Sequence, residues 1–264
     1  MSDVIGAVGA ARGCHAPSIA GFWRLRGASS LKVLVVASQK GGSGKTTLAG
    51  HLAVQAELSG AGPVGLIDVD PQGSLADWWN ERTAPNPFFI QTAVSRLADD
   101  IKELAAHGME LLIIDTPPAL TATIADVIRV ADLVAIPTRP SPHDLRSIGA
   151  TMELVEHLGK PLVFVVNGAA PRARITTEAV ALLSQYGPLA PAIVHQRVDF
   201  AAAMIDGRTV MELPGASRSA DEIAELWDYL RDRLDGAGVR RRRLPSLPAL
   251  VVNSPAQMKA EGRA

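Results

Sequence analysis

The sequence lacks the features that define several large classes of protein. It has a single cysteine, Cys14, in 264 residues, which excludes a disulfide framework and any iron–sulfur or zinc–thiolate cluster within the chain. Aromatic residues make up only 4%, which argues against a protein that binds single strands by stacking their bases. No apolar run approaches the about 20 residues that a membrane-spanning helix needs. Pro245 and Pro248 would also break an amphipathic helix near the end of the chain, so we expect no membrane partner.

Neither sign of charge dominates the chain. Lysine and arginine number 26 against 27 aspartate and glutamate residues, which leaves a formal net charge of -1. This balance excludes a protein coated in positive charge but allows a local basic patch. Hydrophobic residues make up 47% of the chain, which is ample for a folded core and excludes wholesale disorder.

The two ends differ in character from the middle of the chain. Residues 1–30 are rich in glycine and alanine and lack the pattern of a signal peptide, so we expect a flexible extension. Residues 235–264 contain an arginine run at 240–243 followed by prolines, which predicts a flexible tail. Residues 31–234 are therefore expected to form one domain.

Short apolar segments alternate with helical patterns through this domain. Apolar segments predict strands at residues 32–38, 64–69, 110–115, 133–137 and 161–167. Helices are expected at residues 46–59, 74–81, 95–106, 144–158, 176–185 and 219–234. Strands that are apolar throughout and alternate with helices predict an α/β fold with a mostly parallel sheet and helices on both faces. Ligands of such folds bind at the carboxyl ends of the strands.

A glycine-rich loop, QKGGSGKTT at residues 39–47, follows the first strand and opens a helix. Its glycines allow backbone N–H groups to point at phosphate oxygens, and the helix adds its positive end. Lys45 would reach the β- and γ-phosphates, while Thr46 would offer a hydroxyl to Mg²⁺. The loop predicts a P-loop NTPase that binds ATP through Gly41, Gly42, Ser43, Gly44, Lys45, Thr46 and Thr47. The first glycine of the usual pattern is replaced by Gln39, and an extra lysine, Lys40, precedes the glycine pair.

Three aspartates follow strands near this loop. Asp68 and Asp70 lie two residues apart in DVDPQG and so can approach one site. Carboxylates there can orient water or hold a metal-bound water. Asp115 ends the apolar run LLIID and is expected near Mg²⁺, together with Thr46.

The motifs KGGSGKTT, DVDPQG and DTPP resemble those of the ParA/MinD family of ATPases, which have a deviant phosphate loop. The resemblance implies that Lys40 reaches the partner's ATP in a nucleotide-sandwich dimer. It further implies that Asp70 prepares the attacking water with support from Asp68, and that Asn167 contacts adenine. Residues 191–212 resemble a base-binding loop and a helix that faces the dimer partner. With residues 141–149, the chain looks similar to small plasmid-partition ATPases of the ParF type.

The resemblance implies an ATP-dependent DNA-partition ATPase, weak without a partner, located in the cytoplasm on the nucleoid. ATP would drive homodimerisation and nonspecific DNA binding, and a small centromere-binding (ParB/ParG-like) protein would stimulate hydrolysis. Relatives use arginines late in the domain for DNA, which nominates Arg197 and Arg218. Arg218 could instead pair with Asp221 or Glu222.

Two alternatives share part of this sequence pattern. A ParA-like ATPase that positions a protein cargo or a DNA-transfer complex would need every residue named above. A metabolic P-loop enzyme that activates a small substrate with ATP would also need a substrate pocket. Trp78 and Trp79 fall on one expected helix and are interpreted as core or partner packing. His143 and His195 lie near strand ends and are interpreted as surface or turn residues.

Overall fold

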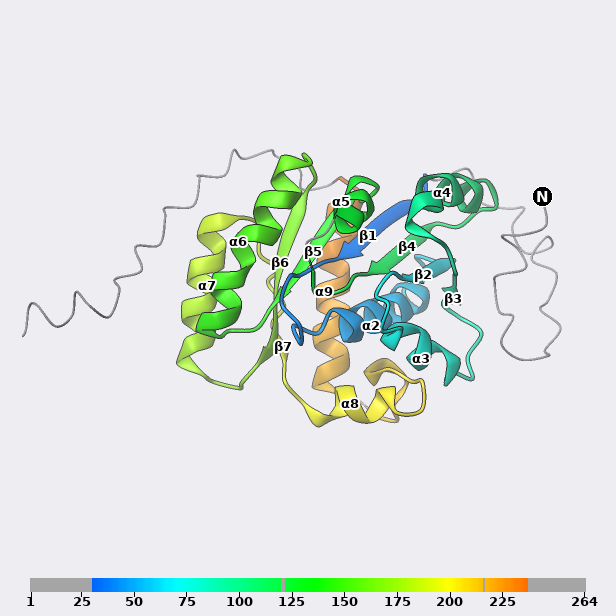
Figure 1. Ribbon diagram of the computed structural model, residues 1–264. Helices are drawn as coiled ribbons and strands as arrows, with labels where there is room; N and C mark the ends of the chain where they lie inside the picture. Colours follow the sequence, from blue (N-terminus) through cyan, green and yellow to red (C-terminus); the bar gives the residue numbers. More distant parts are fainter. Residues whose placement is uncertain (1–29, 120–121, 216, 237–264) are drawn as a thin grey trace, which may run out of the picture.

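The computed structural model describes residues 30–119, 122–215 and 217–236. Their seven-stranded sheet has the order β3-β2-β4-β1-β5-β6-β7, and all its paired strands are parallel (Figure 1). The expected α/β fold is confirmed, and the sheet of the described residues is wholly parallel. Its strands are β1 (Lys32–Val36), β2 (Val64–Asp68), β3 (Phe88–Phe89), β4 (Leu111–Asp115), β5 (Leu133–Thr138), β6 (Leu162–Ala169) and β7 (Val194–His195).

Most of the two expected flexible ends lies outside the described residues. This applies to residues 1–29 with Cys14, and to residues 237–264 with the arginines at 240–243.

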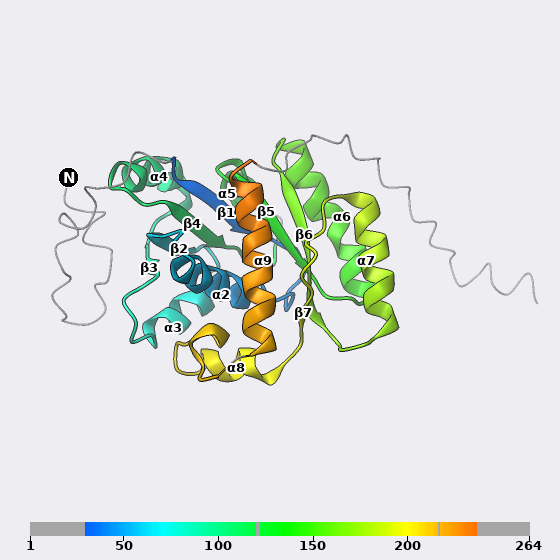
Figure 2. The same ribbon diagram turned by 180° about the vertical axis from the view of Figure 1, so that it is seen from behind.

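Helices cover both faces of the sheet. The α-helices are α2 (Lys45–Leu58), α3 (Ser74–Asn80), α4 (Leu97–Ala106), α5 (Ala122–Arg129), α6 (Pro142–His157), α7 (Arg174–Tyr186), α8 (Val198–Met204) and α9 (Arg218–Leu234), with short 3₁₀ helices η2 (Val94–Arg96) and η3 (Val210–Glu212). Helices α6 and α7 lie together on one face, and α2 and α9 lie on the other (Figures 1 and 2). No described helix combines the length and apolar character needed to cross a bilayer.

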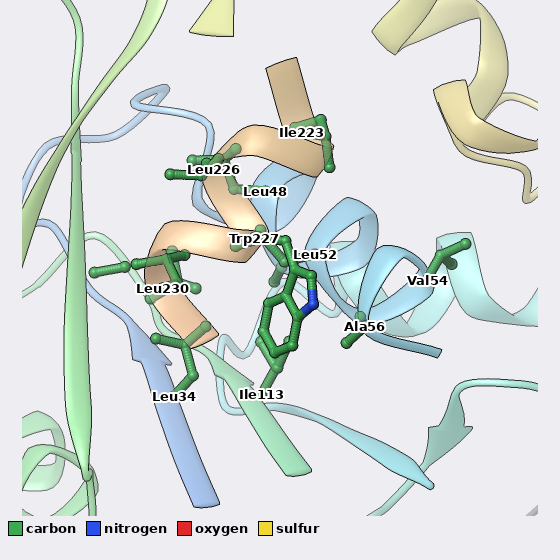
Figure 3. Close-up of a cluster of buried hydrophobic side chains, with 14 of the residues drawn as sticks. Leu34, Leu48, Leu52, Val54, Ala56, Ile113, Ile223, Leu226, Trp227 and Leu230 are labelled. Carbon is green, nitrogen blue, oxygen red and sulfur yellow. The ribbon is translucent and has the colours of Figure 1, made fainter. Parts of the chain in front are cut away.

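Alternate residues of each strand feed two separate hydrophobic cores. Leu34 and Ile113 pack with α2, α3, α8 and α9 in the first core, where Trp227 of α9 lies against the strands and Leu52 (Figure 3). Val35 and Ile114 point to the second core, with α4, α5, α6 and α7. The period of two along a strand explains this division. Since both faces are buried, the middle positions of β1, β2, β4 and β5 are apolar or glycine, and polar residues such as Asp68 and Asp115 stand at strand ends.

The parallel register brings the ends of neighbouring strands to one edge. Asp68 at the end of β2 is the register partner of Asp115 at the end of β4. Asp115 in turn is level with Val36, the last residue of β1. The loop after β1 therefore emerges beside both carboxylates. We call this side of the sheet the carboxyl edge.

The five expected strands and six expected helices are all present, with ends shifted by a few residues. The sequence analysis missed β3, β7 and α5, and it located α8 only as part of a longer stretch. β3 and β7 have two residues each, too few for any periodicity to be detected. Their position at the sheet edges comes from tertiary contacts, which the local sequence does not encode.

Candidate functional site

The glycine-rich loop has a shape that its glycines permit. Gly42 and Gly44 have φ values of 74° and 88°, in the left-handed region that side chains disfavour. A Cβ on Gly44 would also lie 2.2 Å from Nδ2 of Asn167. That amide nitrogen donates to the Ser43 carbonyl at 2.7 Å. Buried Asn167, at the carboxyl edge of β6, thus braces the loop directly, and its expected adenine contact stays a prediction.

The two lysines of the loop have different environments. Lys45 is buried, and its Nζ donates to the Lys40 carbonyl at 3.3 Å. Burial lowers the pKa of Lys45, while the charges of Asp115 and Asp70 act in the opposite direction. Lys40 is exposed, and its side chain forms no ion pair with a described residue. Lys45 is therefore fixed towards the carboxylates, whereas the Lys40 ammonium is available to another molecule.

Thr46 and Asp115 form a polar pair beneath the loop. The Thr46 hydroxyl donates to Oδ2 of Asp115 at 2.6 Å. Burial, together with the nearby charge of Asp68, raises the pKa of Asp115 to about 7, although the Thr46 hydrogen bond acts in the opposite direction. A buried carboxylate beside a second carboxylate favours a bound cation. Hydroxyl and carboxylate oxygens are the ligands that Mg²⁺ prefers, so these residues fit the ion that accompanies ATP.

The DVDPQG segment forms a turn organised by its first aspartate. Oδ1 of Asp68 accepts from the Asp70 amide at 2.9 Å. Its Oδ2 accepts from the amides of Leu75 and Ala76 at 3.0 and 3.2 Å. Burial raises the pKa of Asp68, although these backbone hydrogen bonds oppose the shift. Asp68 thereby joins the turn to the first residues of α3 and leaves Asp70 facing the cavity.

A cavity of about 920 Å³ connects these groups. The phosphate loop and Asp70 line one part of it, and this volume suits a nucleotide. The sequence analysis missed several residues that line the remainder, namely Ser74, Asp77, Asn80 and Glu81 of α3 and its C-cap, with Pro118, Arg139 and Met204. The start of α3 directly after DPQG could have indicated the first group. No local signal marks Met204, which α8 brings from far along the chain.

Of the two arginines nominated for DNA, Arg197 is the N-cap of α8 and Arg218 is the first residue of α9. Arg197 is mostly buried and donates to both carboxylate oxygens of Glu222, at 2.6 and 2.7 Å. His195 also contacts Glu222, with Nδ1 at 2.8 Å. Arg218 is exposed, and it pairs with no acidic residue within the described ranges. The structure leaves Arg218 accessible and commits Arg197 to Glu222.

A phosphate loop, a threonine–aspartate pair and a nucleotide-sized cavity at the carboxyl edge define a P-loop ATPase. Residues 34–210 match the CobQ/CobB/MinD/ParA nucleotide-binding domain family. Because this match spans more than half of the chain, the protein belongs to that family, and the ParA/MinD resemblance is confirmed.

Several individual proteins are similar to this chain. The maintenance of carboxysome distribution protein A of Halothiobacillus neapolitanus is 32% identical over 205 residues, covering 73% of this chain and 93% of that protein. Protein IncC of Escherichia coli is 28% identical over 279 residues, covering 84% and 76%. Among solved structures, MinD of Pyrococcus horikoshii with Mg-ADP has a TM-score of 0.67 at 17% identity, covering 80% and 99%. The protein is an ATPase that uses ATP with Mg²⁺.

Proposed function

We propose that this protein is a positioning ATPase that forms an ATP-dependent dimer, binds DNA nonspecifically and distributes a protein cargo. The observation that carries the proposal is the exposed Lys40 beside the buried Lys45. Lys45 already supplies one lysine charge to the phosphates of the nucleotide bound in its own subunit. A second cation at the mouth of the same loop is suited to the phosphates of a facing subunit.

Different residues of one subunit have different roles in ATP hydrolysis. Loop amides and Lys45 hold the phosphates, and Thr46 and Asp115 hold Mg²⁺, which neutralises phosphate charge when bound. Asp70 orients the attacking water, and Asp68 fixes the turn that carries Asp70. Lys40 of the facing subunit completes the site, so hydrolysis depends on dimerisation.

The outer face of α8 supports a contact between subunits beside the nucleotide. Val198 is 82% exposed and Ile205, the C-cap, is 79% exposed. Residues seven apart lie on one helical face, and Met204 between them lines the cavity. An apolar helix face at the rim of a nucleotide site favours burial when ATP brings two copies together.

A protein cargo is favoured by the Halothiobacillus neapolitanus relative, which this chain covers almost completely. That relative is named for the distribution of carboxysomes. Plasmid partition is the second candidate, supported by the similarity to protein IncC. In both cases a partner protein stimulates hydrolysis, and the ATPase resides on the nucleoid in the cytoplasm. A centromere-binding partner belongs to the second candidate, and a cargo adaptor to the first.

The dimer is tested with Lys40→Ala in multi-angle light scattering with ATP and Mg²⁺. We expect the wild type to double its mass and Lys40→Ala to stay monomeric, while its affinity for ATP changes less than threefold. Lys160→Ala is the matched control, since Lys160 lies before β6 at the opposite edge of the sheet. ATP-dependent dimerisation of Lys40→Ala at the protein concentrations used for the wild type would show that Lys40 does not hold the two subunits together.

The hydrolytic assignment is tested with Asp70→Ala. We expect ATP binding and dimerisation to persist and turnover to disappear, because the variant removes only the group that orients water. Phosphate release at the wild-type rate would refute this role.

A further inference from the structure

Helix α3 is fixed at both ends to parts of the molecule that differ in function. At its start, the amides of Leu75 and Ala76 donate to Asp68, which also accepts from the Asp70 amide. At its other end, Arg82 follows the C-cap Glu81, and the Arg82 side chain is buried. Because α3 has only seven residues, a displacement at one end moves the other.

Arg82 is an unusually buried charge. Its side chain is 2% exposed and pairs with Glu212 at 2.9 Å. One guanidinium nitrogen donates to the Gly207 carbonyl at 2.6 Å and the other to the Asn86 carbonyl at 2.8 Å. These hydrogen bonds satisfy the two terminal nitrogens of the guanidinium and offset its costly desolvation, although the buried Nε has no hydrogen-bond partner among the described residues. Both terminal nitrogens of Arg82 donate to Glu212, at 3.1 and 2.9 Å, and such a bidentate pair fixes direction as well as distance.

Two partners of Arg82, Gly207 and Glu212, belong to residues 207–212, a segment that follows α8 and includes η3. Burial acts to raise the pKa of Glu212, but hydrogen bonds from Arg82 and Thr209 outweigh it and lower the pKa overall. The Thr209 amide and hydroxyl each donate to Glu212 at 2.8 Å. Glu212 is thus an ionised carboxylate that accepts hydrogen bonds both from Thr209 in its own turn and from Arg82 at the end of α3.

Close packing strengthens the same junction. The Trp78 indole donates to the Arg208 carbonyl at 3.1 Å, and the Arg82 guanidinium lies 4.9 Å from the Trp78 ring centroid. A Cβ on Gly207 would approach the Arg82 backbone nitrogen to 2.4 Å. On the opposite side, the Trp78 ring lies 3.1 Å from where a Cβ of Gly50 in α2 would be. Helix α3 is therefore held between the phosphate-loop helix and the end of α8.

We propose that Arg82 is a positioning residue for ATP hydrolysis, which rests on the role proposed above for Asp70. By fixing the end of α3 to Glu212 and Gly207, Arg82 sets the turn that carries Asp70. Met204 of α8 also lines the cavity. A movement of α8 would therefore change the position of Asp70, which orients the attacking water. Arg82 itself is not among the residues that line the cavity.

The test compares Arg82→Gln with Arg82→Lys and with Arg208→Gln as the matched control. Arg208 lies on the same segment, but among the described residues its exposed side chain forms an ion pair only with Asp206. Two quantities are measured, namely the turnover rate at saturating ATP and the affinity for a fluorescent ATP analogue. We expect Arg82→Gln to lower turnover at least tenfold with affinity changed less than threefold, since a misplacement of about 1 Å can cost about 100-fold in rate. Arg82→Lys should recover part of the loss, and Arg208→Gln should match the wild type.

Hydrogen exchange supplies a readout at the site itself. Arg82→Gln should speed exchange in the peptide covering residues 68–77, where Asp68 protects three amides, and leave residues 39–47 unchanged. Wild-type turnover and exchange in Arg82→Gln would overturn the proposal. So would a loss of ATP affinity as large as the loss of turnover, since that would mean general damage.

Two further variants keep the outcomes distinct. If Arg82→Gln does not fold, Glu212→Gln retains the shape of the partner and is expected to show the same separation of turnover from affinity. Asp70→Ala is measured in parallel. Wild-type turnover in Asp70→Ala refutes the proposed water-orienting role, whereas an inactive Asp70→Ala beside an unaffected Arg82→Gln refutes only the positioning role.

Discussion

The carboxylates of the site differ in how firmly the backbone holds them. Asp68 accepts three amide hydrogen bonds, and Asp115 accepts the Thr46 hydroxyl and the Thr116 amide. Asp70 accepts the amide of exposed Gln72 at 3.0 Å and faces the cavity. The firmly held carboxylates shape the site, and the one facing the cavity is placed to meet a substrate.

His51, in the phosphate-loop helix, predicts a measurable pH dependence of stability. It is fully buried, and burial lowers its pKa from 6.5 to about 4. Its Nδ1 lies 2.8 Å from the Thr47 carbonyl, so Nδ1 carries the proton of a neutral ring. Between pH 6.5 and 4 the unfolded chain binds the proton and the folded chain does not. The buried neutral ring of His51 therefore contributes its full stability to the fold above pH 6.5, and this stability declines as the pH falls towards 4.

The measurement compares urea unfolding of the wild type and His51→Leu at pH 7 and pH 5. From the two pKa values, the wild type should lose about 2 kcal/mol relative to the variant on going to pH 5. Taking the difference between the proteins cancels other titrating groups. These include Asp115, whose raised pKa has the opposite effect. An equal stability difference at both pH values would show that His51 titrates normally.

At the scale of the helix and the loop, α3 illustrates what the sequence could predict. The residues SLADWW and the preceding DPQG turn predicted a helix near the site, and the structure begins α3 at Ser74. The docking of α3 depends on Arg82 and Glu212, which are 130 residues apart. No local pattern relates them, because the contact exists only after α8 has folded beside α2. Phosphate-loop chemistry is local and was therefore predictable, whereas this junction was not.

A substitution at Gly207 tests how closely residues 207–212 pack against the end of α3. Gly207 has φ 74°, and an added Cβ would lie 2.4 Å from backbone of Arg82. Gly159, in the loop before β6, has φ 66° but nothing within 4 Å of an added Cβ. Both alanine variants incur the left-handed backbone cost of about 1–2 kcal/mol. Only Gly207→Ala must also displace α3, which typically adds about 1–3 kcal/mol.

Urea denaturation of Gly207→Ala and Gly159→Ala separates the two contributions. We expect Gly207→Ala to be the less stable of the two variants by at least about 1 kcal/mol. Equal losses in the two variants would mean that residues 207–212 yield freely and that α3 is not held there.

At the scale of the whole molecule, the near-neutral charge constrains how DNA could be bound. A net charge of -1 gives no overall attraction to a polyanion. In the dimer that we propose, a second copy would double exposed cations such as Arg218. The parallel sheet supports this arrangement, because it gathers the phosphate loop, Lys40 and the outer face of α8 at one edge. In the mechanism that we propose, dimerisation through that edge would make DNA affinity a consequence of ATP binding.

The most direct test of this account is binding to random-sequence DNA, followed by fluorescence anisotropy over a range of salt concentrations. With ATP and Mg²⁺ we expect binding whose logarithm falls linearly with the logarithm of salt concentration, as contacts to phosphates require. With ADP, or with Lys40→Ala and ATP, binding should be lost. Equal affinity with ATP and ADP, or no binding with ATP at low salt, would contradict an ATP-gated DNA-binding dimer.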